Sequence, residues 1–312
     1  SNNDGNTSNT VFGKNAFTNA GTVLGDVGAD NNVIIGEDAM GAANSVAVAL
    51  NNVAIGYKSL TENTAGDYNV AIGANTLLVA DGSESNNVAI GASAMSAVDN
   101  NLSEQNIAIG RLALTGGSGA LIANIAIGHL AMDGTTSSAQ TGTIAIGYHA
   151  LGALTSGSSN VSIGYDSSLA NATGSSNVAL GKNAMRGAGN HSQNIAIGHS
   201  SLYAVTTGGD NIAIGYTAAS AITTDNKVVA IGSDAYKSMD ISTGHDTNPA
   251  NGSGNIAIGH KSMTAYSHDG VLRNTAVGFL TMMTGANHAA TDNVALGYQA
   301  LKANTTGDKN VC

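Results

Sequence analysis

The ten residues "NNVAIGYKSL", at positions 51–60, decide the fold because the chain repeats their pattern along its whole length. Near-copies include "YNVAIGANTL", "NNVAIGASAM", "QNIAIGHSSL" and "DNVALGYQAL". The glycine of this phrase, called here the marker glycine, occurs in 17 copies. From Gly56 onward the copies are 17 to 19 residues apart, except for one step of 27 between Gly232 and Gly259. The chain is therefore a repeat array.

Two positions of the phrase vary least. The residue four before the marker glycine is asparagine in 14 of the 17 copies, and we expect its side-chain amides to bond from copy to copy. We expect the glycine to permit a positive φ or a close backbone approach. The predicted asparagine ladder consists of Asn32, Asn52, Asn69, Asn87, Asn106, Asn124, Asn160, Asn177, Asn194, Asn211, Asn255, Asn274 and Asn293. The predicted structural glycines are Gly56, Gly73, Gly91, Gly110, Gly128, Gly147, Gly164, Gly181, Gly198, Gly215, Gly232, Gly259, Gly278 and Gly297.

The order Asn, Val, Ala, Ile, Gly alternates with period two, which predicts a strand with a branched apolar face and a flat face of small residues. A second short element follows, with Ala or Ser three residues after the glycine and Leu or Met four after it. A polar turn then leads to the next copy. This pattern predicts an all-β fold, a parallel β-solenoid (β-roll) of about 17 stacked rungs.

A single thin ribbon of this kind would gain little from burial, since each rung offers about three sizeable apolar side chains. We therefore expect the flat Ala and Gly face to be covered by other copies of the chain, and a homotrimer is the favoured assembly. We also expect one array over residues 1–312, cut from a longer chain, because an eighteenth copy begins at Asn310. Within it, residues 1–50 hold irregular rungs, residues 51–312 hold regular ones, and residues 237–254 form an insertion.

The composition excludes several classes of function. The net charge is −10 with only 11 Lys and Arg, which disfavours nucleic acid as a partner. No uninterrupted apolar run is long enough to span a bilayer, so we expect no membrane insertion by this segment. A lone cysteine, Cys312, excludes an internal disulfide framework.

The repeats resemble those of two related families. The phrases "NNVAIGYKSL", "SNVSIGYDSS" and "DNVALGYQALKANTTGDKN" are similar to the head repeats of trimeric autotransporter adhesins, and more closely to repeats of bacteriophage tail-fibre proteins. The resemblance covers the chain from about Asn9 to Cys312. It implies a trimeric, left-handed parallel β-roll that reaches a receptor on a host or other surface. The rungs here are longer than those of the adhesin heads.

Enzymatic readings fit the pattern poorly. "IGYKSL" matches the hexapeptide of β-helix acyltransferases, but those enzymes need several contiguous hexapeptides per rung, and this chain has one. Calcium-binding nonapeptides need Gly- and Asp-rich turns on every rung, whereas "GGD" at 208–210 stands alone. His129, His199 and His260 each follow a marker glycine on separate rungs, so they predict no metal site within one chain. We expect a non-enzymatic protein without a cofactor.

Recognition of a ligand, where it occurs, is expected on the exposed edge of the roll or on the insertion. Large side chains recur directly after the marker glycine. They form either a column that packs at the edge of the roll or an aromatic strip on which sugar rings stack. The candidate recognition residues are Tyr148, Tyr165 and Tyr216 in this column, with His245 and Asp246 in the insertion.

The sequence favours a structural segment of a phage tail fibre or a similar receptor-reaching appendage, on a virion tail or cell surface. Its expected partners are its own copies, other virion or envelope proteins, and a surface glycan or receptor. The main alternative is a bacterial trimeric adhesin whose roll surface binds glycan or matrix. A hexapeptide-type acyltransferase is a weaker alternative.

Overall fold

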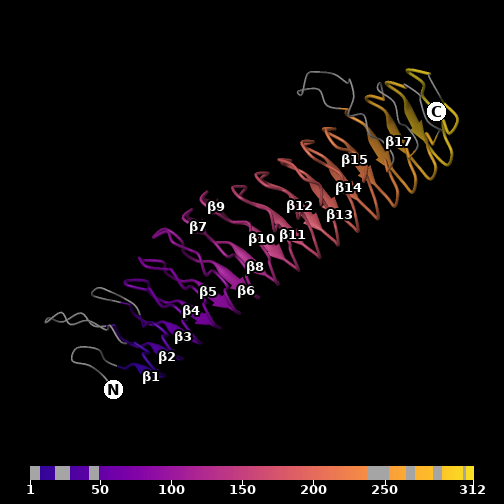
Figure 1. Ribbon diagram of the computed structural model, residues 1–312. Coiled ribbons are helices and arrows are strands. Elements are labelled where there is room, and N and C mark those ends of the chain that lie inside the picture. Colours follow the sequence, from indigo (N-terminus) through magenta and orange to yellow (C-terminus); the bar gives the residue numbers. More distant parts are fainter. Residues whose placement is uncertain are drawn as a thin grey trace. The chain divides into compact units, whose positions relative to one another are not determined.

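The computed structural model describes residues 8–17, 29–41, 49–237, 253–264, 271–283, 290–304 and 307–312. Regular structure in these ranges consists of short β-strands, and none of them contains a helix that could cross a membrane. The strands are parallel and stack as a β-solenoid, which confirms the predicted fold class (Figure 1). The chain divides into two compact units, Ser1–Ser159 and Asn160–Cys312, and each is described by itself.

In the first unit, eight three-residue strands stack in sequence order, and a pair of two-residue strands lies beside them. The stacked strands are β1 (Thr10–Phe12), β2 (Val33–Ile35), β3 (Val53–Ile55), β4 (Val70–Ile72), β5 (Val88–Ile90), β6 (Ile107–Ile109), β8 (Ile125–Ile127) and β10 (Ile144–Ile146). The additional pair is β7 (Leu121–Ile122) and β9 (Gln140–Thr141). β1 pairs directly with β2, and the copy marked by Gly25 lies outside the described residues.

In the second unit, another eight three-residue strands stack in the same way. They are β11 (Val161–Ile163), β12 (Val178–Leu180), β13 (Ile195–Ile197), β14 (Ile212–Ile214), β15 (Val229–Ile231), β16 (Ile256–Ile258), β17 (Thr275–Val277) and β18 (Val294–Leu296). Each pair is in register, so equivalent residues lie above one another: Ile195 pairs with Ile212, Ala196 with Ala213. The stack runs through the 27-residue step, where β15 pairs directly with β16.

The strand has the two faces that the sequence predicts, but the prediction of which face meets other chains was wrong. The central alanine that most strands carry, such as Ala54 or Ala196, is fully buried inside a single chain. It packs in an interior with the Ala or Ser and the Leu or Met that follow the marker glycine. The branched residues, such as Ile163 with 38% of its surface exposed, face outward. The core therefore combines these alanines with the larger residues of the turns, and in β2 the larger Ile34 is buried at the central position.

The second element of each rung is a turn, where the sequence left room for a second strand. Residues two and four after the marker glycine take positive φ values, as at Lys58 (52°) and Leu60 (52°). These turns still bond from rung to rung: the Leu60 N–H donates to the Thr76 carbonyl at 2.9 Å. Alternating backbone handedness lets the chain reverse within a few residues while it buries Leu60.

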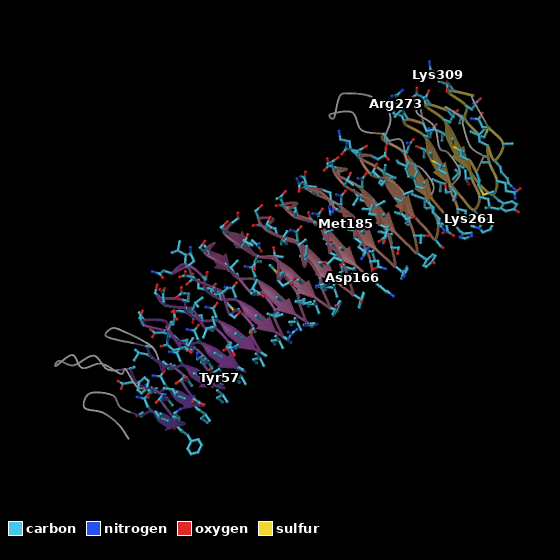
Figure 2. All side chains as sticks on the ribbon, in the orientation of Figure 1. Tyr57, Asp166, Met185, Lys261, Arg273 and Lys309 are labelled. Atoms are coloured by element: carbon cyan, nitrogen blue, oxygen red, sulfur yellow. The ribbon has the colours of Figure 1, made fainter. Side chains whose placement is uncertain are left out.

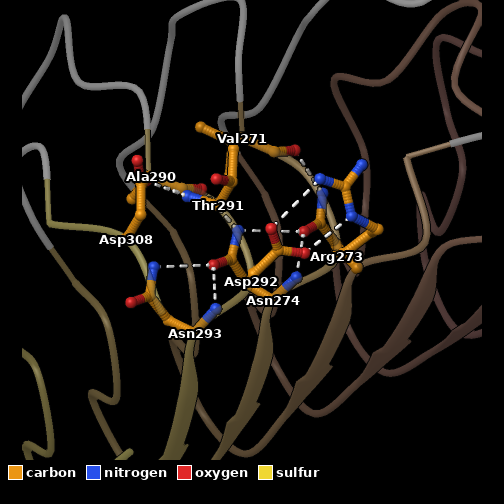
Figure 3. A network of polar contacts seen from close by, with 9 residues as sticks. Val271, Arg273, Asn274, Ala290, Thr291, Asp292, Asn293 and Asp308 are labelled. Atoms are coloured by element: carbon orange, nitrogen blue, oxygen red, sulfur yellow. Dashed lines mark hydrogen bonds and ion pairs between the residues drawn. The ribbon is translucent and has the colours of Figure 1, made fainter. Parts of the chain in front are cut away.

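The predicted asparagine ladder is present, and it holds neighbouring rungs together. The Oδ1 of Asn274 accepts the backbone N–H of Asn293 at 3.1 Å and its Nδ2 at 3.0 Å (Figure 3). The Nδ2 of Asn274 also donates to the carbonyl of Ala290 at 2.7 Å, which anchors the turn before the next strand. Each side chain thus satisfies buried backbone groups that the three-residue strand leaves over.

The ladder has a natural interruption at Val228, which offers no side-chain amide. Its backbone N–H still donates to Oδ1 of Asn211 at 2.9 Å. On the next rung, Nδ2 of Asn255 donates to the hydroxyl of Tyr236 at 2.8 Å. Tyr236 stands where other rungs have Leu or Met, and it is fully buried, which raises its pKa far above the usual range. A tyrosine hydroxyl therefore serves the ladder at this rung, one of those that lack the asparagine.

The marker glycines stack backbone against backbone. At Gly181 φ is +136°, and a Cβ there would lie 2.7 Å from the carbonyl oxygen of Gly198 on the next rung. Gly297 has a similar φ of +127°, but nothing lies within 4 Å of its Cβ position. The column is therefore confined to glycine both by conformation and by the distance between rungs.

Substitution of Gly181 by alanine should lower the free energy of unfolding by about 3 kcal/mol or more, because backbone strain and overlap with Gly198 add together. The matched variant Gly297→Ala keeps the strain without the overlap and should cost about 1–2 kcal/mol. Urea denaturation followed by circular dichroism measures both. Equal losses would show that overlap between rungs contributes nothing.

Substitution of Asn106 by alanine should cost about 2–4 kcal/mol, because it strands buried backbone groups. Asn106 accepts the Asn124 N–H at 3.0 Å and donates to the Leu121 carbonyl at 2.6 Å. The exposed neighbour Gln105 provides the control, and Gln105→Ala should change stability by about 0.5 kcal/mol or less. Similar unfolding midpoints for the two variants would contradict a stabilising role for the ladder.

Candidate functional site

Side chains directly after the marker glycines form an exposed line along each unit, called here the outer column. Each one leaves the backbone where a strand ends and the turn begins, as Tyr57 does after β3 (Figure 2). Its described members are Lys14, Glu37, Tyr57, Ala74, Ala92, Arg111, His129 and Tyr148 in the first unit, and Tyr165, Lys182, His199, Tyr216, Ser233, His260, Phe279 and Tyr298 in the second. In-register stacking turns a variable sequence position into a continuous surface.

In the first unit three successive members of the outer column are in contact. Nη1 of Arg111 lies 3.0 Å from Nε2 of His129, whose ring centroid is 5.5 Å from that of Tyr148. Because an arginine only donates hydrogen bonds, Nε2 of His129 is the acceptor in this contact. Lys58, one residue further along its rung, lies 5.4 Å above the ring of Tyr57.

In the second unit the outer column contains stacked rings. His199 and Tyr216 lie 5.4 Å apart at 19°, and Phe279 and Tyr298 lie 5.8 Å apart at 26°. His260 joins the latter pair, with its centroid 5.2 Å from that of Phe279. These spacings are within the range of favourable aromatic pairs. Where two rings stack, each covers one face of the other and presents its edge to solvent.

The candidate recognition residues from the sequence do not gather at one place. Tyr148 packs against His129 and His149. The ring of Tyr165 lies 5.6 Å from the Lys182 ammonium. Tyr216 lies three rungs beyond Tyr165 and stacks on His199. All three are exposed members of the outer column. His245 and Asp246 lie outside the described residues.

Buried polar groups lie in a second column that the sequence analysis missed. Seven residues before the marker glycine, a turn residue offers its carbonyl to the ladder: His191 accepts Nδ2 of Asn177 at 2.9 Å. Glu84 and Gln140 occupy the same position on their rungs, and all three side chains are buried. The spacing of this position relative to the marker glycine is visible in the sequence and is as regular as that of the ladder. Its residue types vary too widely, however, to indicate that the side chains are buried.

Burial shifts the protonation of two groups in this column. It raises the pKa of Glu84, whose Oε2 accepts the Gly82 N–H at 2.9 Å. It lowers the pKa of His191 to about 4, and neither ring nitrogen has a hydrogen-bond partner. His191 fits because Gly174 and Gly208 precede and follow it in the column. Buried His191 is therefore neutral at pH 7.

The described residues bring together no group of three or more His, Cys, Asp or Glu side chains able to hold a metal ion. His129, His199 and His260 lie on separate rungs of the outer column, each beside an aromatic ring. The chemistry that this surface offers is stacking, hydrogen bonding and charge.

Comparison of the chain with protein-family models, with curated proteins and with solved structures found no match. The geometry of the solenoid and of its outer column therefore carries the functional inference.

Replacing His191 by glutamine should reduce the loss of the free energy of unfolding at acid pH. Glutamine suits this position, because Gln140 occupies it on another rung. Above pH 6.5 the imidazole is neutral in both the folded and unfolded chain. Below pH 6.5 only the unfolded chain binds the proton readily, so protonation favours the unfolded state. As the pH falls from 6.5 to about 4, His191 should therefore lower the free energy of unfolding of the native protein by about 3 kcal/mol in total.

Urea unfolding at pH 7, 5 and 4 measures this difference between the native protein and His191→Gln. The variant His199→Gln, which removes an exposed histidine of the outer column, is the control for the loss of a histidine as such. Parallel stability curves for the native protein and His191→Gln would refute a neutral buried imidazole.

Proposed function

We propose that this chain is a structural, non-enzymatic segment of a receptor-reaching fibre, such as a phage tail fibre. The observation that carries the proposal is the in-register repetition of one hydrogen-bonded rung through each unit. Every added rung supplies the same ladder contacts, so the segment gains length without a new fold. Stiffness follows from buried asparagines and from glycine backbones that touch between rungs.

The assembly that we propose is a homotrimer joined through the outward face of the strands. The first and third residues of the 16 stacked strands are Val, Ile, Leu or Phe, with two threonines and no charge. An uncharged apolar face that continues over many rungs favours association. A second copy of the chain fits it best, because only an equal rung spacing lets such side chains meet over several rungs. The resemblance to adhesin heads favours three copies.

A bacterial surface adhesin is the second candidate, and the outer column is the observation that favours it. Exposed tyrosines with interleaved cations are typical of surfaces that bind polar ligands. Either function places the segment outside a cell, on a virion tail or a cell surface. The acyltransferase alternative receives less support, since each rung carries one hexapeptide and not several contiguous ones.

Mass measurement of the purified chain in its native state should give three copies per particle. Replacing Ile197 and Ile214, which pair on the outward face of β13 and β14, by lysines should release monomers because it places two charges in the interface. The control Gln193→Lys puts a lysine at the position of Lys227 and should stay trimeric. A monomeric native chain would contradict the assembly, and binding of acyl-CoA would favour the enzyme instead.

A further inference from the structure

The outer column of the second unit has a gap at one rung. Tyr216 follows β14 and His260 follows β16, but the residue between them, after β15, is Ser233. Tyr216 stacks on His199 on its other side, and His260 packs on Phe279 on its other side. The two uncovered faces of Tyr216 and His260 therefore look toward each other across a small side chain.

The height of this gap suits one more ring. Parallel rungs are spaced about 4.8 Å apart, so the flanking rings are about 10 Å apart along the stack. A ring inserted midway would lie about 5 Å from each neighbour, which is an ordinary stacking distance. The existing pairs of the same column have spacings of 5.2 to 5.8 Å. Tyr216 is 55% exposed, so the gap is open to solvent.

The rim of the gap is polar. The Ser233 carbonyl accepts the Lys261 backbone N–H at 3.0 Å and lies 3.1 Å from Nδ1 of His260. A carbonyl only accepts, so Nδ1 carries a hydrogen in this contact, and Nε2 is left for a further polar partner. Lys261 follows His260 in the chain, and its side chain points outward (Figure 2). The Asp234 carboxylate, held by the Thr217 hydroxyl at 2.6 Å and by Lys237 at 2.8 Å, completes the rim.

We infer that this gap, bounded by Tyr216, Ser233 and His260, is a binding slot for one hexose ring of a surface glycan. A hexose presents C–H groups on its two faces and hydroxyls around its edge. The faces match the rings of Tyr216 and His260, and the hydroxyls match Nε2 of His260, the Lys261 ammonium and the Asp234 carboxylate. An aromatic guest would leave this rim without partners, and a nucleotide would meet a chain of net charge −10.

Other places in the outer column lack this arrangement. Lys182 occupies the rung between Tyr165 and His199, with its ammonium over the tyrosine ring. In the first unit, Ala74 and Ala92 separate Tyr57 from Arg111 by three rungs, which is too far for one ring to touch both sides. Among the described residues, the slot at Ser233 is thus a single site, and it adds a ligand to a segment otherwise proposed as structural.

The test uses the full chain and a panel of methyl glycosides of glucose, galactose and N-acetylglucosamine, observed by saturation-transfer NMR. At least one glycoside should receive saturation at its ring C–H protons. The variant Ser233→Tyr fills the gap with the side chain that Tyr216 provides one rung earlier, and it should weaken binding about tenfold or more. Tyr216→Ala should weaken it comparably, whereas Tyr165→Ala, in the same column, should leave it unchanged.

Thermal unfolding of each variant shows whether the solenoid is intact, since Ser233→Tyr introduces a residue that the column already carries on other rungs. Unchanged glycoside binding by Ser233→Tyr would overturn the proposal, and so would the absence of binding to every glycoside in the panel. Stronger saturation transfer to phenol than to any glycoside would also overturn it, because the slot would then select an aromatic ring. None of these results bears on the mass of the assembly.

Discussion

The side-chain amide of one asparagine per rung is the interaction on which the rest of this structure depends. A three-residue strand is too short to satisfy the backbone of a rung, and the amide supplies the missing partners. The contact of Asn106 with both Asn124 and Leu121 joins the start of one strand to the chain just before the next, where Leu121 begins β7. Because the bonded residues are equivalent on successive rungs, the ladder also fixes the register. Every column of the solenoid follows from that register.

Much of the fold could be predicted from periodicity, because spacing determines what stacks. The marker glycines, the asparagine ladder and the parallel stack were all evident from residues such as Asn52 and Gly56. Which face of the strand points inward was not evident from the sequence. Alternation shows that Ala54 and Ile55 lie on opposite faces, but it does not show which of them is buried. The alanines lie inside because the turn after the strand folds Leu60 back, so that it is buried with them in one core. The same reversal turned the expected second strand into a turn.

The candidate site was less predictable than the fold. Tyr216 could be placed on the outer column from the sequence, but its partner His199 could be recognised only once the rungs were in register. The gap at Ser233 is defined by the absence of a ring between two rungs that have one. A small residue at a variable position does not by itself indicate a binding site in a sequence. The burial of His191 could not be predicted for a related reason. The neighbouring rungs have glycine at the equivalent position, so the sequence shows no pattern of buried side chains there.

The left-handed turn residues have a consequence for how the chain reaches its folded state. Residues such as Lys58 and Leu60 adopt positive φ, which an isolated segment disfavours by about 1–2 kcal/mol per residue. Only a neighbour already in place, through bonds such as that from Leu60 to Thr76, compensates for this. A rung therefore has little tendency to form alone and forms readily against a finished one. Folding should nucleate rarely and then propagate by templated growth, rung after rung, in the manner of a zipper.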